Sequence, residues 1–299
     1  MILIVSDNNE VTTTEVIRWL LQMGKKFIRV HEDEYFEIKV QNKRIFLESH
    51  RNQFFLDQIT SLWYRRGGLQ FKRLKYQNPS IHEHMNEVQH WLEDYVIHTL
   101  ESKKHINKQS NSDVNKLIVL EVAESLGLDI PKSFLADSTN DVLLHKTIVK
   151  PLTGNPTIDD LTDGFEGMMY TSVVESKEES FFMSFFQEKI EKDFEIRVFF
   201  LNGRIWSVAI ISQNDEQTQI DFRKYNKTMP NRNVPYKLPS AIEAKICKLM
   251  DKLDLDCGSI DFMKRNDKYF FLEVNPIGQF LGISKICNYS LEREIALYL

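Results

Sequence analysis

The sequence predicts an α/β protein with α+β features, because a strand-helix-strand pattern opens the chain and β-hairpins follow later. The apolar runs Ile2–Val5 and Phe27–Val30 flank an amphipathic segment that ends at a glycine, which indicates a β-α-β unit. Further along, Phe194–Leu201 and Arg204–Ile211 are joined by Asn202-Gly203, the strongest short-range hairpin signal. A chain of 299 residues can hold two or three such subdomains.

Two polar stretches separate the elements of the first half. Residues 101–113 contain KKHINKQSNSD, with no hydrophobic period beyond Ile106, so we expect a domain boundary there. Residues 151–167 are expected to form a polar loop. Around these stretches, strand patterns occur at Arg44–Leu47, Leu62–Tyr64, Ser133–Ala136 and Thr147–Lys150, and helix patterns at Met85–Leu100 and Leu117–Leu126.

The second half is expected to begin with a strand and a largely apolar element. An amphipathic helix, a second hairpin and a short final helix are expected to follow. These elements are Met168–Val174, Phe181–Gln187, Ala241–Leu253, the hairpin Gly258–Met263 with Tyr269–Val274, and Leu291–Leu299. We therefore expect an N-terminal domain over residues 1–110, a central subdomain over 111–185 and a C-terminal subdomain over 186–299.

Composition excludes several classes of protein. The chain has only 11 glycines, where about 7% of residues is usual, and it contains neither a G-x-x-x-x-G-K-[ST] phosphate loop nor a G-x-G-x-x-G turn. A net charge of −5 disfavours bulk attraction to nucleic acid or to an anionic membrane. Three cysteines without metal-ligand spacing, no apolar run long enough to span a membrane and no signal peptide predict a cytoplasmic protein.

The second hairpin carries the clearest candidate for chemistry. Glu273 and Asn275 stand two apart on one expected strand and therefore share a face, and Asp261 can lie opposite them if the strands pair. Two carboxylates and an amide oxygen are hard ligands that suit Mg²⁺ between nucleotide phosphates. The alternative is a salt-bridged carboxylate beside an ordinary Asn275-Pro276 turn. The residues alone leave the two alternatives about even.

Three upstream features are each weak evidence for nucleotide binding when considered alone. Lys116 opens a helix, and Lys150 ends an apolar strand, where a lysine commonly just extends to solvent. The run Gln187–Ile190, followed by Glu195, can offer backbone groups to an adenine and a carboxylate to a ribose. Each feature has an ordinary structural explanation.

In order along the chain, these pieces resemble the ATP-grasp superfamily from about residue 113 to 280. The resemblance implies an ATP-grasp fold with an N-terminal pre-ATP-grasp domain of β-α-β type, a central domain and a C-terminal ATP-grasp domain. It also implies ATP and Mg²⁺ as cofactors, and an enzyme that activates carboxylates as acyl phosphates. A departure is the stretch after Lys150, which offers only Thr153-Gly154-Asn155, Gly164 and Gly167 where the superfamily commonly has a glycine-rich loop.

A narrower resemblance connects the chain with the microviridin or graspetide ligases, particularly those of grasp-with-spasm systems. It is carried by D-F-E-I-R-V-F-F (193–200), S-Q-N-D-E-Q-T (212–218), D-F-R-K-Y-N (221–226) and L-W-Y-R-R (62–66). Such ligases join Asp or Glu side chains of a ribosomal precursor peptide to Ser or Thr hydroxyls or Lys amines. The implied partner is that peptide, with its leader and core, and a homodimer is left open.

The resemblance also implies roles for individual residues. Cofactor-binding roles fall on Lys116, Lys150, Gln187, Glu188, Lys189, Ile190 and Glu195, and metal-ligand roles on Asp261, Glu273 and Asn275. Arg223, Arg197 and Asn226 are the expected catalytic residues, facing the transferring phosphoryl group and the acceptor carboxylate. An arginine suits this place because its planar fork binds carboxylate or phosphate and stays charged. Arg197 could equally pair with a carboxylate of the core.

Peptide binding is expected at two places. Arg65 and Arg66, with Lys72, Arg73 and Lys75 nearby, form a basic cluster in an acidic protein and could attract an acidic peptide. The alternative is a set of ordinary surface charges. Asp215 lies in a segment that could be the tip of a leader-binding hairpin.

Three other functions compete with the peptide cross-linking ligase. An ATP-grasp ligase that adds a free amino acid to a peptide or small carboxylate would share every ATP residue. A non-catalytic ATP-binding scaffold is disfavoured because it has no need for the metal ligands and Arg223. A nucleic-acid binder is disfavoured by net charge and by the lack of a motif.

Overall fold

The computed structural model describes residues 1–153, 157–161, 165–168, 171–212 and 231–299, with side chains described outside residues 154–170. The chain forms two compact units. Unit 1 comprises Met1–Asp113, Asp254–Gly258 and Pro276–Leu299, and unit 2 comprises Val114–Leu253 and Ser259–Asn275. The mixture of sheets and helices confirms the predicted α/β class.

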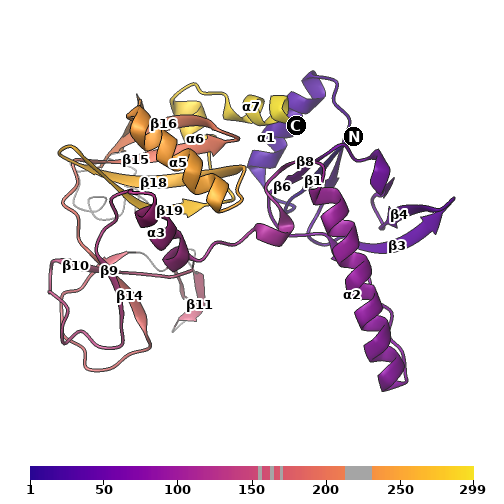
Figure 1. Cartoon of the computed structure of the whole chain (residues 1–299), viewed down its shortest axis with the longest axis horizontal. Helices are drawn as coiled ribbons and strands as arrows, with labels where there is room; N and C mark the ends of the chain where they lie inside the picture. Colours follow the sequence, from indigo (N-terminus) through magenta and orange to yellow (C-terminus); the bar gives the residue numbers. More distant parts are fainter. Residues whose placement is uncertain (154–156, 162–164, 169–170, 213–230) are drawn as a thin grey trace. The chain divides into compact units, whose positions relative to one another are not determined.

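Unit 1 is built on a parallel four-stranded sheet with the order β2-β1-β6-β8 (Figure 1). All four side chains of the central strand β1 are buried, as expected for a parallel strand covered on both faces. Helix α1 connects β1 to β2 and confirms the predicted β-α-β unit, and α7 packs against α1. These elements are β1 (Ile2–Val5), α1 (Val11–Gln22), β2 (Phe27–Val30), β6 (Ser61–Tyr64), β8 (Lys104–Ile106), α6 (Leu281–Ile286) and α7 (Leu291–Tyr298).

A second sheet of unit 1 has the order β5-β4-β3-β7. Buried side chains from both sheets and from α2 form one hydrophobic core, which includes Leu3, Phe36, Phe54 and Val96. The elements are β3 (Tyr35–Gln41), β4 (Arg44–Glu48), β5 (Gln53–Phe55), a 3₁₀ turn η1 (Leu56–Gln58), β7 (Gln70–Phe71), the long helix α2 (Pro79–Glu101) and a second 3₁₀ turn η2 (Gln109–Asn111).

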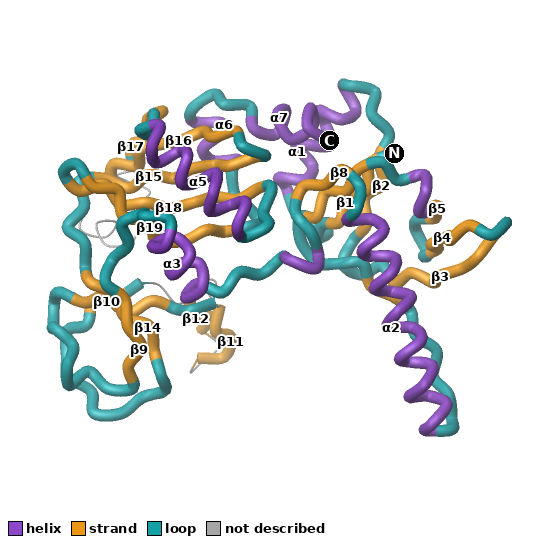
Figure 2. Tube along the Cα trace, viewed as in Figure 1, coloured by secondary structure: helices purple, strands orange, loops and turns teal. Residues whose placement is uncertain are grey.

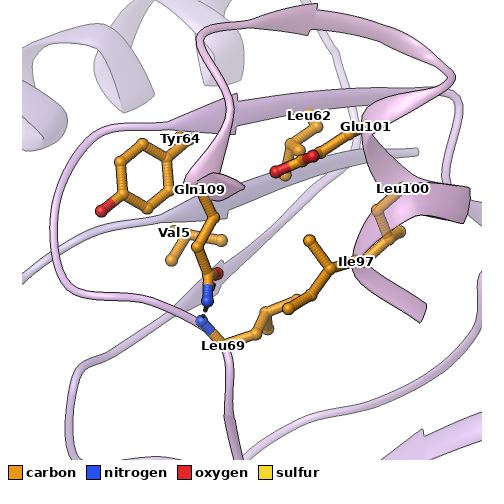
Figure 3. Close-up of a pocket in the computed structure, with 8 residues that line it drawn as sticks. All are labelled: Val5, Leu62, Tyr64, Leu69, Ile97, Leu100, Glu101 and Gln109. Atoms are coloured by element: carbon orange, nitrogen blue, oxygen red, sulfur yellow. Dashed lines mark hydrogen bonds between the residues drawn. The ribbon is translucent and has the colours of Figure 1, made fainter. Parts of the chain in front are cut away.

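A small pocket lies within unit 1 between β1, β6 and α2 (Figure 3). Gln109 closes one side, where its Oε1 accepts a hydrogen bond of 2.8 Å from the backbone N–H of Leu69. The lining is mostly apolar and contains no lysine or arginine. This pocket therefore lacks the cations that a nucleotide triphosphate requires.

Unit 2 contains two larger sheets and a short hairpin (Figure 2). The first sheet has the order β13-β10-β14-β9, and the second has the order β17-β16-β15-β18-β19. Helix α3 contacts both β19 and α5. The elements are α3 (Lys116–Ser125), β9 (Ser133–Ala136), β10 (Thr147–Lys150), β11 (Thr157–Leu161), β12 (Phe165–Met168), β13 (Ser172–Val173), β14 (Ser184–Glu188), β15 (Phe194–Leu201), β16 (Arg204–Ile211), β17 (Arg232–Tyr236), α5 (Ser240–Lys252), β18 (Cys257–Arg265, whose first two residues belong to unit 1) and β19 (Lys268–Asn275).

Both predicted hairpins are confirmed. β15 and β16 pair antiparallel around Asn202 and Gly203, which have φ values of 44° and 82°. Positive φ at both central positions is the geometry that makes Asn-Gly favourable in a two-residue turn. β18 and β19 also pair antiparallel.

Three sequence expectations differ from the structure. The expected polar loop 151–167 contains the paired strands β11 and β12, and the strand expected at Met168–Val174 is divided between the end of β12 and β13. The stretch 101–113, expected to hold a domain boundary, contains β8 and η2, and the first segment of unit 1 ends at its last residue, Asp113. Residues 276–299, expected in the C-terminal subdomain, belong to unit 1 because α7 packs on α1. This last contact joins helices far apart in the sequence, which local patterns do not reveal.

Candidate active site

The β18–β19 hairpin brings two carboxylates face to face. Asp261 lies directly opposite Glu273, and Ser259 lies opposite Asn275. A β-bulge follows Asp261, and it interrupts the regular register at this point of the ladder. The side chains of Asp261 and Glu273 are 17% and 20% exposed, so both are accessible at the edge of a buried hairpin.

Lys116 approaches Glu273 from helix α3. Asn115 caps this helix, since its Oδ1 accepts a hydrogen bond of 2.9 Å from the backbone N–H of Leu117. Lys116 is therefore the first helical residue, and its Nζ lies 3.2 Å from Glu273 Oε2. The helix start thus holds a cation beside one of the paired carboxylates.

The same lysine contacts the segment that follows β10. Lys116 Nζ donates hydrogen bonds of 3.0 Å to the carbonyl oxygens of Pro151 and Thr153. Lys150, the last residue of β10, directly precedes Pro151 and is partly buried. The structure therefore connects the two predicted phosphate-binding lysines through the backbone after Lys150.

Arg197 provides a second cation from β15, the strand next to β18 in the sheet. Its Nη1 lies 3.3 Å from Asp261 Oδ2 and 3.4 Å from Asp261 Oδ1. Asp261 and Glu273 thus each face a cation from a different element. The alternative considered for Arg197 was an ion pair with a carboxylate of the core. Arg197 does pair with a carboxylate, and this carboxylate belongs to Asp261 of the candidate metal site.

The predicted adenine segment begins inside the first sheet of unit 2. Gln187 is fully buried in β14, and its Nε2 donates a hydrogen bond of 3.0 Å to Ser133 Oγ. Among the described residues, Gln187 Oε1 is buried without a hydrogen-bond partner. The backbone N–H groups of Glu188 and Lys189 donate to the carbonyl oxygens of Lys132 and Lys146, both at 2.8 Å.

The next residues connect this sheet to the five-stranded sheet. Ile190 is buried, and Glu195 in β15 forms a buried ion pair with Lys192. The carboxylate expected at a ribose is therefore engaged with a neighbouring lysine. Arg223, Asn226 and Asp215 lie outside the described residues, as do Gly154 and Asn155.

The sequence suggested that Arg65 belongs to an exposed basic surface, but in the structure Arg65 is buried. Its side chain is only 2% exposed, with Nη2 lying 3.2 Å from Glu10 Oε1 and Nη1 donating a hydrogen bond of 3.1 Å to Gly278 O. Burial by itself raises the pKa of Glu10, but the charge and hydrogen bond of Arg65, with hydrogen bonds from Thr13, lower it to about 2. The sequence error arose because adjacent arginines after a strand give no sign of which one is buried.

Two further members of the basic cluster are engaged with acidic partners. Lys72 Nζ donates a hydrogen bond of 2.8 Å to Glu37, and Arg73 forms two hydrogen bonds with Glu93, at 2.9 and 2.5 Å. The Nε atoms of Arg65 and Arg66 are both buried without a hydrogen-bond partner among the described residues. Arg66 differs from Arg65 in that its side chain is partly exposed.

Over the described part of the chain, no group of three or more His, Cys, Asp or Glu side chains is placed to hold a metal. The candidate set on the hairpin instead combines two carboxylates with the amide of Asn275. Few protein ligands suffice for Mg²⁺ because it keeps several of its waters and binds substrate phosphates. The donor chemistry therefore fits Mg²⁺ with a bound nucleotide better than an all-protein metal cage. In the same part of the chain, no helix is long and apolar enough to cross a membrane.

Solved structures resemble this chain over nearly its full length. The macrocyclase MdnC from Microcystis aeruginosa MRC, bound with the precursor peptide MdnA, has a TM-score of 0.76 and 26% identity, covering 99% of this chain and 98% of MdnC. A RiPP-associated ATP-grasp ligase from Chryseobacterium gregarium, in complex with ADP and a leader and core peptide, has a TM-score of 0.77 and 23% identity, covering 99% and 94%.

A more distant structure shares the fold. The D-alanine–D-alanine ligase from Bacillus anthracis, complexed with ATP, has a TM-score of 0.54 and 12% identity, covering 99% of this chain and 94% of that protein. No protein-family model matches the sequence, and no curated protein matches it. The chain therefore has the ATP-grasp fold and is an ATP-grasp ligase, as the sequence predicted. Within that class it resembles ligases that act in the maturation of ribosomal peptides.

Proposed function

We propose that this ligase activates Asp or Glu side-chain carboxylates of a ribosomal precursor peptide and cross-links them to Ser or Thr hydroxyls or to Lys amines. The observation that carries the proposal is the opposed pair Asp261 and Glu273, with Asn275 on the same hairpin and a cation beside each carboxylate. This combination suits transfer of a phosphoryl group, in which charge neutralisation and positioning supply most of the catalysis.

ATP and Mg²⁺ are the proposed cofactors. Asp261, Glu273 and Asn275 would hold Mg²⁺, which supplies charge neutralisation at the phosphate oxygens. Lys116 and Lys150 would contact the phosphates, and Gln187 to Ile190 would contact the adenine, where the unpartnered Gln187 Oε1 is an acceptor suited to an amino group. The neighbours support this assignment, since one is solved with ATP and another with Mg and ADP.

The proposed reaction has two steps. A carboxylate oxygen of the peptide attacks the γ-phosphorus of ATP, the bond to the bridging oxygen breaks, and ADP leaves as an acyl phosphate forms. A hydroxyl or amine of the same peptide then attacks the acyl carbon, inorganic phosphate leaves with the bonding electron pair, and the nucleophile loses its proton. Lys116, Arg197 and Arg223 would stabilise the negative charge that moves during these steps.

The peptide partner is supported by the resemblance to ligases solved with precursor peptides. Arg66 is the proposed contact for an acidic residue of the peptide, because its side chain is partly exposed, whereas that of Arg65 is buried. Asp215 stays a proposed contact for the leader. Arg65 is not proposed, because its guanidinium is committed to Glu10 and Gly278.

Mass spectrometry of a reaction product tests the proposal. The purified chain is incubated with ATP, Mg²⁺ and a short Thr/Ser- and Asp/Glu-containing peptide encoded beside its gene. We expect the loss of one water from the peptide for each cross-link, with one ADP formed per link. A product heavier by an amino acid would contradict the proposal and favour the ligase that adds a free amino acid.

Matched variants connect the product to the site. Asp261→Asn and Arg223→Met should abolish cross-linking while the protein stays folded. Asp267→Asn, in the exposed turn of the same hairpin, is the control and should retain wild-type turnover. Normal turnover by Asp261→Asn would disprove the metal-ligand role.

A further inference from the structure

Asn107 occupies an unusual place in unit 1. It directly follows β8, in the polar stretch that the sequence suggested was a linker, yet it is only 4% exposed. Its φ of 55° lies in the left-handed region, which asparagine tolerates better than most residues. A buried polar side chain on a backbone of this kind needs partners to offset the loss of water.

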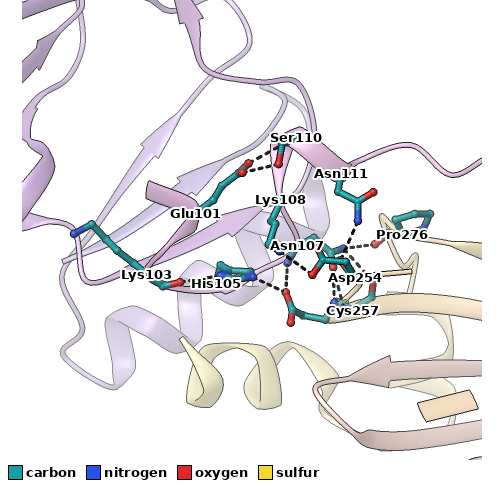
Figure 4. A network of polar contacts seen from close by, with 11 residues as sticks. Glu101, Lys103, His105, Asn107, Lys108, Ser110, Asn111, Asp254, Cys257 and Pro276 are labelled. Atoms are coloured by element: carbon teal, nitrogen blue, oxygen red, sulfur yellow. Dashed lines mark hydrogen bonds and ion pairs between the residues drawn. The ribbon is translucent and has the colours of Figure 1, made fainter. Parts of the chain in front are cut away.

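The Asn107 carboxamide binds two chain segments at once (Figure 4). Its Oδ1 accepts hydrogen bonds of 3.0 Å from the backbone N–H groups of Asp256 and Cys257. Its Nδ2 donates to Cys257 O at 3.0 Å and to Pro276 O at 2.7 Å. These bonds use both donors and both lone pairs that an asparagine side chain offers.

Neighbours of Asn107 make further contacts with residues 254–257. The backbone N–H of Asn107 donates to Asp256 Oδ2 at 3.1 Å, and His105 Nε2 lies 3.3 Å from the same oxygen. Lys108 Nζ lies 2.7 Å from Asp254 Oδ1. The stretch around Asn107 is therefore fastened to residues 254–257, and Asn107 alone among these side chains also reaches Pro276.

The two segments are the two ends of the ligand-bearing hairpin. Cys257 is the first residue of β18, the strand that carries Asp261. Pro276 follows Asn275, the last residue of β19, by a single peptide bond. The register pairs Ser259 with Asn275, so the Asn107 bonds lie where the open end of the hairpin begins.

We propose that Asn107 is a positioning residue that sets the spacing of the β18 and β19 ends and thereby the geometry of Asp261, Glu273 and Asn275. This inference rests on the proposed function, in which those three residues bind Mg²⁺ with the nucleotide. Mg²⁺ demands near-ideal octahedral geometry, so a small change in ligand spacing weakens its binding. Groups that orient metal ligands typically change affinity by about 10- to 100-fold when removed.

Two glycine variants test the proposal. Asn107→Gly removes the carboxamide and keeps a residue that tolerates positive φ. Asn266→Gly is the matched control, since Asn266 also has a positive φ of 51° but lies exposed in the turn at the opposite end of the same hairpin. A comparison of the two variants separates loss of the Asn107 hydrogen bonds, called the clamp here, from the general effect of replacing an asparagine of positive φ with glycine.

Metal binding is measured directly, with Mn²⁺ as a paramagnetic probe in the presence of ADP. We expect Asn107→Gly to weaken Mn²⁺ binding about 10-fold or more, whereas Asn266→Gly should bind like the wild type. In an ADP-release assay with the precursor peptide, the Mg²⁺ concentration for half-maximal rate should rise by the same factor, and saturating Mg²⁺ should restore most of the rate. Binding and Mg²⁺ dependence at wild-type levels in a folded Asn107→Gly protein would overturn the proposal.

A second variant covers the case in which Asn107→Gly does not fold. Asn107→Asp keeps an acceptor for the two backbone N–H groups but removes the donor to Cys257 O and Pro276 O, so it should weaken Mn²⁺ binding. Wild-type binding by Asn107→Asp would count against the clamp. Asp261→Asn distinguishes failure of the proposed metal site from failure of the positioning role of Asn107. If Asp261→Asn binds Mn²⁺ like the wild type, the proposed metal site is wrong. If it loses Mn²⁺ while the Asn107 variants retain it, only the positioning role is wrong.

Discussion

Lys116 and Glu273 form an ion pair in which Lys116 Nζ lies 3.2 Å from Glu273 Oε2, although one residue begins α3 and the other lies in β19. The same Nζ also donates to the carbonyl oxygens of Pro151 and Thr153. One cation therefore joins the helix start, the hairpin with the candidate metal ligands and the segment after Lys150. All of these residues belong to unit 2.

Replacing Lys116 should affect turnover more than stability. A partly exposed ion pair contributes at most about 1 kcal/mol to folding, whereas a fixed cation at a transferring phosphoryl group can change the rate by roughly 100-fold or more. We expect Lys116→Met to lower the rate of ADP release by about that factor and to leave the thermal unfolding temperature nearly unchanged. Lys248→Met, on the exposed side of α5, is the control. Equal rates for the two variants would show that Lys116 has no role in turnover.

The Glu10–Arg65 pair should make the free energy of unfolding decrease as the pH falls into the acidic range. The pKa of Glu10 is about 2 in the folded protein against 4.5 as its reference value, so its contribution is complete above pH 4.5 and is lost as the pH falls toward 2. We expect Glu10→Gln to lower the free energy of unfolding at pH 7 by roughly 1 to 3 kcal/mol. The difference from the wild type should shrink between pH 4.5 and 2.

Denaturant unfolding at several pH values measures this difference. Glu15→Gln provides the control, because Glu15 forms an ion pair with the exposed Arg18 of the same helix. A difference between Glu10→Gln and wild type that stays constant down to pH 3 would contradict the assigned pairing.

Cys257 should be inert toward thiol reagents in the native protein. Burial raises the pKa of its thiol to about 12, so at pH 8 a fraction on the order of one in ten thousand would be thiolate even with full access to reagent. We expect iodoacetamide to modify Cys257 only after unfolding in guanidinium, while the partly exposed Cys247 is modified in the native state. Peptide mass mapping measures both. Native modification of Cys257 as fast as that of Cys247 would mean that the β18 start opens in solution.

Local patterns were sufficient for the hairpin that carries the candidate metal ligands. Period two placed Glu273 and Asn275 on one face, and the Asp261–Glu273 register follows once the strands pair. Lys116 was weak by itself because its significance depends on a contact with a strand more than 150 residues later. The sequence could suggest this residue only through the order of motifs in a resembling family.

Contacts over long sequence distances account for what the sequence did not reveal. Asn107 lies in a polar run, and its importance comes from hydrogen bonds to residues 149 and 169 positions away. Arg65 was misinterpreted because its partners Glu10 and Gly278 come from opposite ends of the chain. Composition cannot distinguish such an interior arginine from a surface one.

The three-part construction of unit 1 has a consequence for synthesis of the protein. Helix α7 packs on α1, and Ser61 Oγ donates a hydrogen bond to Leu299 O, so the last residues complete a unit whose first strand is made at the start. Unit 2 has all its residues by Asn275. Because a ribosome adds residues in order, unit 1 can be completed only after residues 276–299 have been made, although its first strand is made first.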